Sequence, residues 1–362
     1  MVYQDLSSSP NLLQQLESAF ERVIYHPVNG FRDLIPSDPI PTDKELALTD
    51  VMFAVRLPLN LSSISQMPNL KLLQLLISGT SHVTCSPFWS TINEERRQGL
   101  VFANGTGLQS GAIAEHVLAT TLNLRLGLNQ LISESKRMQS WAVEKSLGLR
   151  RPELRGSNVG ILGYGAIGRE CARLFTAFGC HVSACTRSGS PSSLSSFQHP
   201  LQGDPNGSLP RTYYSSKDES SFKQFIEQCD VLVVSLPSEK GNYRLIGDNV
   251  LGWMKDDAVL VNVGRGDVVH TDVLVDALKA GLVPRDIDDA QANQLRIGAA
   301  SLDVTDPEPL PQGHELYKLP NAIVTPHCAG LSDRYAERGI RLMLDNVRAL
   351  EAGDLRGLQN VI

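Results

Sequence analysis

The second half of the chain alternates short apolar runs with segments whose apolar residues recur at helical spacing. Each run ends in glycine, proline or polar residues, as buried strands do. Repeated over roughly 200 residues, this alternation predicts a doubly wound parallel sheet. The expected strands are Val159–Leu162, His181–Cys185, Asp230–Leu236, Ala258–Val263, Gly298–Val304 and Ala322–Thr325, with helices at Ser220–Gln228 and Thr271–Ala280 among them.

The chain before about residue 110 carries the same alternation on a smaller scale and predicts an α/β unit of its own. Its last apolar run, Leu72–Ile77, ends in Ser78-Gly79-Thr80. Backbone N–H groups at such a strand end can bind a ligand, but taken alone an ordinary tight turn explains the stretch. The other expected elements are a helix at Asn11–Phe20 and strands at Arg22–His26 and Val51–Val55.

Two longer patterns indicate how the chain divides. The apolar spacing in Ala112–Met138 predicts a helix that is too long to pack on one sheet. We therefore expect this helix to cross between two domains, with a domain boundary near residues 110–115. The final amphipathic pattern, Ser332–Ala352, is expected to return to the first domain. Residues 188–220 and 283–297 are rich in polar residues and are expected to be surface inserts.

A glycine-rich turn follows the strand Val159–Leu162 and opens a helical pattern that runs to Phe178. In Gly163-Tyr164-Gly165-Ala166-Ile167-Gly168, glycine stands where a dinucleotide fold needs a tight turn, close backbone approach to a pyrophosphate, and close helix packing. The helix N-terminus offers unpaired N–H groups and the positive end of its dipole to phosphates. Because a strand precedes the turn and a helix follows it, the segment predicts a dinucleotide site.

The end of the next strand, Thr186-Arg187-Ser188, indicates which dinucleotide binds. An NAD site usually has a carboxylate here for the ribose 2′-hydroxyl, and this chain has Thr186 instead. Arg187 beside two hydroxyls could bind a 2′-phosphate through charge-assisted hydrogen bonds. A solvated arginine in a turn is the ordinary alternative. We therefore expect NADP(H) as the preferred cofactor, with NAD(H) as the alternative.

Composition narrows the class of protein. The 362 residues suffice for two domains, and 42% hydrophobic with 20% charged residues is typical of a packed globular protein. The net charge of −6 argues against a nucleic-acid partner. Met1–Pro10 lacks a signal-peptide pattern and the apolar runs are too short to span a membrane, so a cytoplasmic location is expected. The six cysteines show no metal-ligand spacing and are expected to be reduced.

Three residues with chemical potential follow expected strands: Arg265, Glu308 and His327. Reduction of a 2-keto acid needs a planar cation for the carboxylate, which arginine supplies, and a proton donor for the developing alkoxide, which histidine supplies. A carboxylate beside that histidine fixes its tautomer. Each residue alone has an ordinary explanation as a surface arginine, a turn glutamate or a core histidine. Together, beside a dinucleotide turn, they favour a dehydrogenase.

Five segments in order, from about Pro68 to the C-terminus, make the chain resemble the D-isomer-specific 2-hydroxyacid dehydrogenases, especially the glyoxylate and hydroxypyruvate reductases. The segments are Ala114-Glu115-His116, Gly163–Gly168, Val261–Gly266, Leu302–Val304 with Pro307–Pro311, and Thr325-Pro326-His327.

This resemblance implies that Arg265 binds the substrate carboxylate and carbonyl, that His327 is the acid/base and that Glu308 supports it. It implies that Ser78, Gly79 and Thr80 bind the substrate carboxylate through the backbone. The implied cofactor residues are Gly163, Gly165, Ala166, Ile167 and Gly168 at the pyrophosphate, Thr186, Arg187 and Ser188 at the ribose, Leu236 and Pro237 near the adenosine, Val263, Gly264 and Asp303 at the nicotinamide, and Gly330.

The resemblance also implies the domain arrangement. Residues 1–112 with 332–362 would form a smaller flavodoxin-like α/β substrate domain, and residues 113–331 a Rossmann-type dinucleotide-binding domain. Homodimers are common in the family.

Three departures from the family pattern stand out: Thr186 in place of the acidic ribose ligand, the two long inserts, and a loose match over the first 65 residues. The last leaves open whether the substrate is a small or a bulkier 2-hydroxy acid. A different class of protein, the dinucleotide-regulated C-terminal-binding corepressors, shares the fold and keeps the three catalytic residues. Turnover of a 2-keto acid would distinguish the enzyme from such a binding protein.

Overall fold

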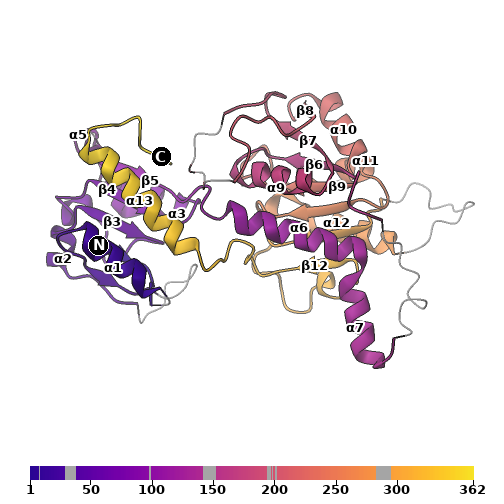
Figure 1. Ribbon diagram of the computed structural model, residues 1–362, viewed down its shortest axis with the longest axis horizontal. Helices are drawn as coiled ribbons and strands as arrows, with labels where there is room; N and C mark the ends of the chain where they lie inside the picture. Colours follow the sequence, from indigo (N-terminus) through magenta and orange to yellow (C-terminus); the bar gives the residue numbers. More distant parts are fainter. Residues whose placement is uncertain are drawn as a thin grey trace, which may run out of the picture. The chain divides into compact units, whose positions relative to one another are not determined.

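The computed structural model describes residues 1–7, 9–28, 38–97, 99–141, 152–193, 197, 199, 202–282 and 295–362. The chain forms two compact units (Figure 1). Unit 1 comprises Met1–Gln109, Ser195–His199 and Ser332–Ile362, and unit 2 comprises Ser110–Leu194 and Pro200–Leu331. Among the described residues, no helix is both long and apolar enough to cross a membrane.

Unit 2 is built on a sheet of parallel strands in the order β12-β11-β10-β9-β6-β7-β8. All residues of β9, β10 and β11 are buried, which explains why central parallel strands read as continuous apolar runs. The strands are β6 (Asn158–Leu162), β7 (His181–Thr186), β8 (Thr212–Ser215), β9 (Val231–Val234), β10 (Val259–Asn262), β11 (Ala299–Leu302) and β12 (Ala322–Val324).

Helices cover both faces of this sheet, as in a doubly wound fold (Figure 1). Along β9, Val231 and Val233 pack in the core beneath α6 and α9, while Leu232 and Val234 pack in the core beneath α10, α11 and α12. The helical elements of unit 2 are α6 (Ser110–Leu126), α7 (Leu128–Met138), α9 (Ala166–Ala177), α10 (Glu219–Gln228), α11 (Asp248–Trp253) and α12 (Thr271–Gly281), with short 3₁₀ turns at Gly266–Val268 and Glu315–Tyr317.

Unit 1 has a smaller parallel sheet in the flavodoxin-like order β2-β1-β3-β4-β5. Helices α1 and α13 pack on one face of it and the short helices α2, α3 and α4 on the other. The elements are β1 (Val2–Tyr3), α1 (Pro10–Ala19), β2 (Tyr25–His26), α2 (Asp43–Ala47), β3 (Val51–Ala54), a 3₁₀ turn (Ile64–Gln66), β4 (Leu72–Leu75), α3 (Ser81–Thr84), α4 (Pro87–Ser90), α5 (Glu94–Arg97), β5 (Val101–Ala103) and α13 (Tyr335–Glu351).

The expected long helix Ala112–Met138 is wrong as a single element. The helix breaks at Gly127, which has φ +63° between α6 and α7. This left-handed conformation is accessible to glycine at little cost and is incompatible with a continuing right-handed helix.

The described part of the expected surface insert 188–220 contains strand β8 and a buried polar anchor. Asp204 is buried and accepts hydrogen bonds from the Tyr164 hydroxyl (2.7 Å) and the Leu209 N–H (2.9 Å). Arg169 of α9 is buried as well and donates to the carbonyl oxygens of Tyr164 and Asp204. The described part of the insert is therefore attached to the unit 2 fold. Most of the second expected insert, 283–294, lies outside the described residues.

Candidate active site

The carboxyl ends of the unit 2 strands gather the predicted cofactor residues along one edge of the sheet. The strand order reverses between β6 and β9, and ligands of open α/β sheets bind at such a switch point. The glycine-rich turn follows β6 at this point. Gly163 has φ +96°, and its carbonyl oxygen accepts a hydrogen bond from the Ser235 hydroxyl (2.8 Å) at the end of β9. The two loops are thereby held together at the switch point.

Gly165 and Gly168 satisfy the other two requirements of a dinucleotide turn. A Cβ atom on Gly165 would meet no atom of the protein within 4 Å, so the backbone here is open to a close-lying ligand. A Cβ on Gly168 would lie 2.2 Å from the Gly163 carbonyl oxygen, so α9 packs on the turn only because residue 168 lacks a side chain. Helix α9 begins at Ala166, and Gly165 provides no side-chain cap. The free N–H groups at Ala166 and Ile167 therefore fit a pyrophosphate.

The loops after β9 and β10 press closely together. A Cβ on Gly264 would lie 2.4 Å from the Leu236 carbonyl oxygen, so glycine is required next to the loop that also carries Pro237. Asn262 is fully buried at the end of β10, and its side chain accepts from the Gly264 N–H (3.1 Å) and donates to the Arg265 carbonyl oxygen (2.9 Å). Sequence reasoning missed Asn262 as a positioning residue, although a polar residue inside an apolar strand was the available signal.

Arg265 is exposed at the carboxyl end of β10, between two glycines that allow its loop to fit. A Cβ on Gly266 would lie 1.9 Å from the carbonyl oxygen of Thr305, which belongs to the loop after β11. The Arg265 guanidinium donates to its neighbour's carbonyl oxygen, on Gly264 (2.7 Å). An exposed, planar cation at this edge can bind a carboxylate in a bidentate manner.

His327 and Glu308 lie in contact beyond the ends of β12 and β11. The distance from His327 Nδ1 to Glu308 Oε1 is 2.8 Å. His327 has φ +52°, an unusual conformation for a non-glycine residue, and its N–H donates to the Thr325 carbonyl oxygen (2.9 Å). A proton on Nδ1 shared with the carboxylate leaves Nε2 as the nitrogen that can exchange a proton with a substrate.

Asp303 holds the loop that carries His327. Its buried carboxylate accepts hydrogen bonds from the Thr325 hydroxyl (2.6 Å), the Cys328 N–H (2.9 Å) and the Ala329 N–H (3.0 Å). The Thr325 hydroxyl also lies 3.4 Å from Nε2 of His116. Burial lowers the pKa of His116, opposed by the nearby Asp303 carboxylate. The segment Ala114-Glu115-His116 signalled this position without giving it a role.

The predicted ribose residues form a turn after β7. The Thr186 hydroxyl accepts a hydrogen bond from the Gly189 N–H (3.1 Å), and Arg187 is exposed. The turn itself, residues 186–189, contains no carboxylate side chain. A glutamate from another loop, Glu239, forms an ion pair with Arg187. The sequence carried no signal for this partner.

A family model described as D-isomer specific 2-hydroxyacid dehydrogenase, NAD binding domain, matches residues 118–329. The chain belongs to this family. It is 31% identical over 287 residues to an uncharacterized protein in the proB 3′ region of Corynebacterium melassecola, covering 79% of this chain and 80% of that protein. It is 27% identical over 292 residues to a glyoxylate reductase of Thermofilum pendens, covering 80% and 74% of the two chains.

The fold is also that of the family. The crystal structure of a D-isomer specific 2-hydroxyacid dehydrogenase from Xanthobacter autotrophicus Py2 superposes with a TM-score of 0.70 at 20% identity, over 100% of this chain and 96% of that one. The predicted family, fold class and enzyme class are confirmed. The chain is therefore a nicotinamide-dinucleotide-dependent oxidoreductase that acts on 2-hydroxy or 2-keto acids.

The remaining predicted residues have definite places, although their roles stay predictions. Val263 is buried beside Gly264, and Gly330 follows the Asp303-bound segment. Ser78, Gly79 and Thr80 follow β4 at the carboxyl edge of the unit 1 sheet. Within the described residues, the six cysteines are free thiols. The same residues contain no group of His, Cys, Asp and Glu side chains that could hold a metal ion.

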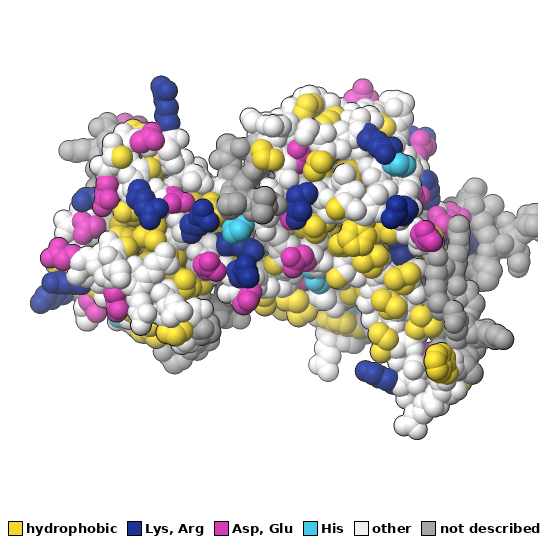
Figure 2. Space-filling model, in the orientation of Figure 1, with side chains coloured by type: hydrophobic (Ala, Val, Ile, Leu, Met, Phe, Trp, Pro, Cys, Tyr) yellow, Lys and Arg dark blue, Asp and Glu magenta, His cyan; other side chains and the backbone are white. Residues whose placement is uncertain are grey.

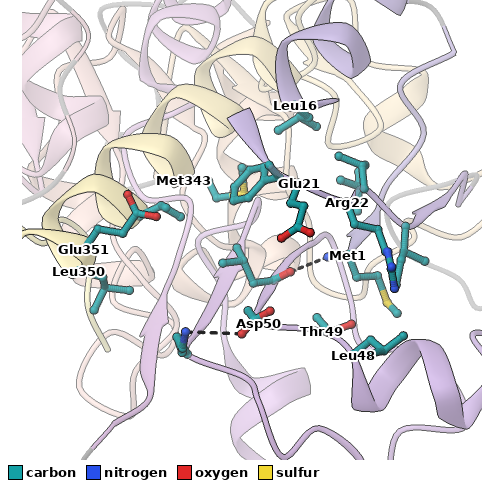
Figure 3. Close-up of a pocket in the computed structure, with 17 residues that line it drawn as sticks. Met1, Leu16, Glu21, Arg22, Leu48, Thr49, Asp50, Met343, Leu350 and Glu351 are labelled. Atoms are coloured by element: carbon teal, nitrogen blue, oxygen red, sulfur yellow. Dashed lines mark hydrogen bonds and ion pairs between the residues drawn. The ribbon is translucent and has the colours of Figure 1, made fainter. Parts of the chain in front are cut away.

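A cavity of about 510 Å³ in unit 1 lies at the other edge of its sheet (Figure 3). Val2 and Val51, at the amino ends of β1 and β3, line it together with Leu16 of α1 and Met343 of α13. Ligands of parallel α/β sheets bind at the carboxyl ends of the strands. This cavity is therefore separate from the predicted substrate segment Ser78–Thr80.

Proposed function

We propose that this enzyme reduces a small 2-keto acid of the glyoxylate or hydroxypyruvate type to the D-2-hydroxy acid, with NADPH preferred over NADH. The observation that carries the proposal is the 2.8 Å contact of His327 with Glu308, at the same sheet edge as the exposed Arg265. The similarity to a glyoxylate reductase supports a small substrate.

Each of the three residues has a separate task in this reaction. Arg265 binds the substrate carboxylate and orients the keto group. His327 donates a proton to the carbonyl oxygen as negative charge develops there, and recovers a proton before the next turnover. Glu308 keeps the imidazole in the correct orientation and stabilises its protonated form. A bound reduced nicotinamide supplies the hydride that this arrangement directs to the keto carbon.

The residues around the glycine-rich turn fit a dinucleotide, because Gly165 leaves space for the pyrophosphate and α9 presents free N–H groups. The preference for NADPH rests on the turn after β7. Thr186 replaces the carboxylate that would repel a 2′-phosphate, and the exposed Arg187 guanidinium can bind that phosphate.

The proposal is tested by mixing the purified protein with NADPH or NADH and glyoxylate or hydroxypyruvate, and following the loss of reduced-cofactor absorbance. Faster oxidation of NADPH supports the whole proposal. Oxidation of NADH alone keeps the enzyme class and overturns the cofactor preference. Oxidation that occurs only with larger 2-keto acids overturns the small-substrate assignment. Comparison with His327→Gln shows whether the observed oxidation belongs to this site.

We propose further that the protein is a homodimer. In this dimer, the second subunit covers the exposed apolar side of α7. None of the described residues of α7 is buried, although its apolar residues fall on one side. Leu128, Ile132 and Met138 are exposed, and Trp141 just after the helix is 98% exposed. Figure 2 shows hydrophobic side chains gathered over α7. Such a patch on a folded chain is typical of an interface.

Light scattering coupled to size-exclusion chromatography tests the homodimer. Twice the chain mass of 39.5 kDa is expected for the wild type, and a shift toward the monomer for Ile132→Glu. Exposed Tyr317, outside α7, provides the matched control as Tyr317→Glu. A wild-type monomer, or a dimer unaffected by Ile132→Glu, would contradict the assignment of this surface.

A further inference from the structure

Arg187, which the proposed function assigns to the 2′-phosphate of NADPH, is paired with a carboxylate. Its guanidinium Nη2 donates to Oε2 of Glu239, and the two side chains are 68% and 45% exposed. Glu239 belongs to the connection between β9 and α11, whereas Arg187 follows β7. The pair therefore brings a carboxylate to the ribose turn, where the chain has Thr186 in place of an acidic residue.

The backbone around Arg187 is tied to the sheet. The Arg187 carbonyl oxygen accepts a hydrogen bond from the hydroxyl of Ser215, the last residue of β8 (3.0 Å). The Ser216 N–H donates to the carbonyl oxygen of Thr186 (2.9 Å). The position of the arginine therefore depends on the fold and not on its side chain alone.

The backbone around Glu239 is held equally well. Its carbonyl oxygen accepts from the Asn242 N–H (2.8 Å), and the Asn242 side chain donates to the Pro237 carbonyl oxygen (2.9 Å). The hydroxyl of Ser238 donates to the Asp267 carboxylate (2.5 Å), which attaches this turn to the segment after β10. The turn thus keeps the Glu239 carboxylate within reach of Arg187.

We propose that Glu239 is a specificity-determining residue for the cofactor, whose carboxylate competes with the 2′-phosphate for Arg187 and so limits the preference for NADPH over NADH. This inference rests on the proposed cofactor site. A 2′-phosphate that binds Arg187 must displace the Glu239 carboxylate or lie close to it, and like charges a few ångströms apart repel. NADH carries no 2′-phosphate, so it leaves the ion pair intact.

Competition between the Glu239 carboxylate and the 2′-phosphate for Arg187 predicts how a charge-removing variant binds each cofactor. Replacing Glu239 by glutamine keeps the size of the side chain and removes its charge. NADP⁺ should then bind about 3- to 10-fold more tightly, since one exposed charge contact near a phosphate contributes on this scale. NAD⁺ binding should change less than about twofold. Added salt should reduce the difference, because exposed charges are screened.

Isothermal titration calorimetry of NADP⁺ and NAD⁺ binding to the full chain tests the inference without relying on turnover. Glu239→Gln is compared with wild type and with Glu227→Gln, an exposed glutamate of α10 that is also ion-paired, with Lys223 at 3.7 Å. Tighter NADP⁺ binding in Glu239→Gln alone is the expected result. Equal effects of the two variants, or none, would overturn the role of Glu239.

The outcomes also separate this inference from the proposed cofactor preference. If wild type binds NAD⁺ more tightly and Glu239→Gln strengthens NADP⁺ binding, the preference is wrong and the competition stands. If Glu239→Gln weakens NADP⁺ binding, the carboxylate orients Arg187 for the phosphate and the competition is wrong. If it weakens NAD⁺ binding and leaves NADP⁺ binding unchanged, Glu239 binds the ribose hydroxyls and the competition is wrong, while the wild-type affinities for the two cofactors decide the preference.

Discussion

His327 Nδ1 lies 2.8 Å from Glu308 Oε1, although the two residues follow different strands, β12 and β11. Their loops meet because the strands are parallel neighbours. Asp303 then fixes the loop of His327 through hydrogen bonds from Thr325 and Cys328. The imidazole is therefore oriented by a contact on its ring and by contacts on its backbone. Proton transfer to a defined substrate atom, as proposed for His327, requires an oriented donor of this kind.

Removing the charge of Glu308 should slow catalysis without unfolding the enzyme. In Glu308→Gln the contact with His327 can persist, but the protonated imidazole loses its ionic partner. We expect kcat for reduction to fall about 10- to 100-fold, less than the ~10²- to 10⁴-fold loss expected for His327→Gln. KM for the keto acid should change little, because the variant leaves Arg265, the proposed substrate-binding residue, unchanged.

Steady-state kinetics and thermal unfolding of both variants provide the measurement. Glu351→Gln, at the end of α13 in unit 1, is the matched control and should retain wild-type kcat. A Glu308→Gln enzyme with wild-type kcat would show that the carboxylate has no role in proton transfer.

Replacing Arg265 by lysine should weaken substrate binding although the positive charge remains. Lysine cannot reproduce the planar, bidentate geometry that arginine offers a carboxylate. The expected result is a decrease of about 10- to 100-fold in kcat/KM for the keto acid, since charged hydrogen bonds contribute ~1.5–3 kcal/mol. Cofactor affinity, measured by calorimetry, should stay within twofold of wild type, roughly the scatter of such surface changes. Arg356→Lys, on the exposed C-terminal segment, is the control.

The elements that were predictable from sequence are those with a strong local signal. The β6 run Val159–Leu162 and the helix after it were foreseen because a fully buried parallel strand is apolar at every position. Strands β1, β5 and β8 were missed, since β1 has two residues and β5 has three, and β8 lies at an edge with polar residues such as Thr212. The break at Gly127 was also missed, because an isolated glycine is tolerated within many helices.

The position of the candidate residues at one sheet edge was predictable, and not all of their contacts were. Arg265, Glu308 and His327 could be placed together because parallel strands bring their carboxyl ends to one edge. The partners of Asp303 depend on the path of the loop after β12, and the partner of Arg187 depends on a turn after β9. Such contacts between loops distant in sequence leave no periodic pattern.

Two glycines of the dinucleotide turn should respond differently to the same substitution. Gly168→Ala places a Cβ 2.2 Å from the Gly163 carbonyl oxygen and 2.8 Å from Ile161 Cγ2, so it should destabilise the fold by ~1–3 kcal/mol. Gly165→Ala meets no protein atom within 4 Å, so its unfolding free energy should change by less than about 0.5 kcal/mol.

Gly165→Ala, which is expected to leave stability unchanged, should instead affect the binding of the cofactor. If Gly165 leaves room for the pyrophosphate, Gly165→Ala should weaken NADP⁺ binding by about tenfold or more through overlap with the ligand. Calorimetry for binding and thermal unfolding for stability separate the two effects. A stable Gly165→Ala protein that binds NADP⁺ as tightly as wild type would contradict the pyrophosphate assignment.

The stability of the protein should decrease as the pH falls through the range in which His116 takes up a proton. Burial holds the pKa of His116 below its usual value of 6.5 in the folded protein. Between the folded value and 6.5, the unfolded chain binds more protons than the folded one, so unfolding free energy rises with pH in this window and levels off on either side. The carboxyl groups titrate mainly at lower pH and contribute little there.

Thermal midpoints of wild type and His116→Gln from pH 5 to 8 isolate this contribution, because the other ionisable groups are common to both proteins. The wild-type midpoint should fall more steeply than that of the variant as the pH drops below about 6.5. His82→Gln in unit 1 is an informative comparison, since burial also lowers the pKa of His82. The thermal midpoint of His82→Gln should also fall less steeply than that of wild type as the pH drops. Unlike His116→Gln, this variant leaves the loop that Asp303 and Thr325 hold unchanged. Parallel profiles for wild type and His116→Gln would mean that His116 titrates alike in the folded and unfolded chain.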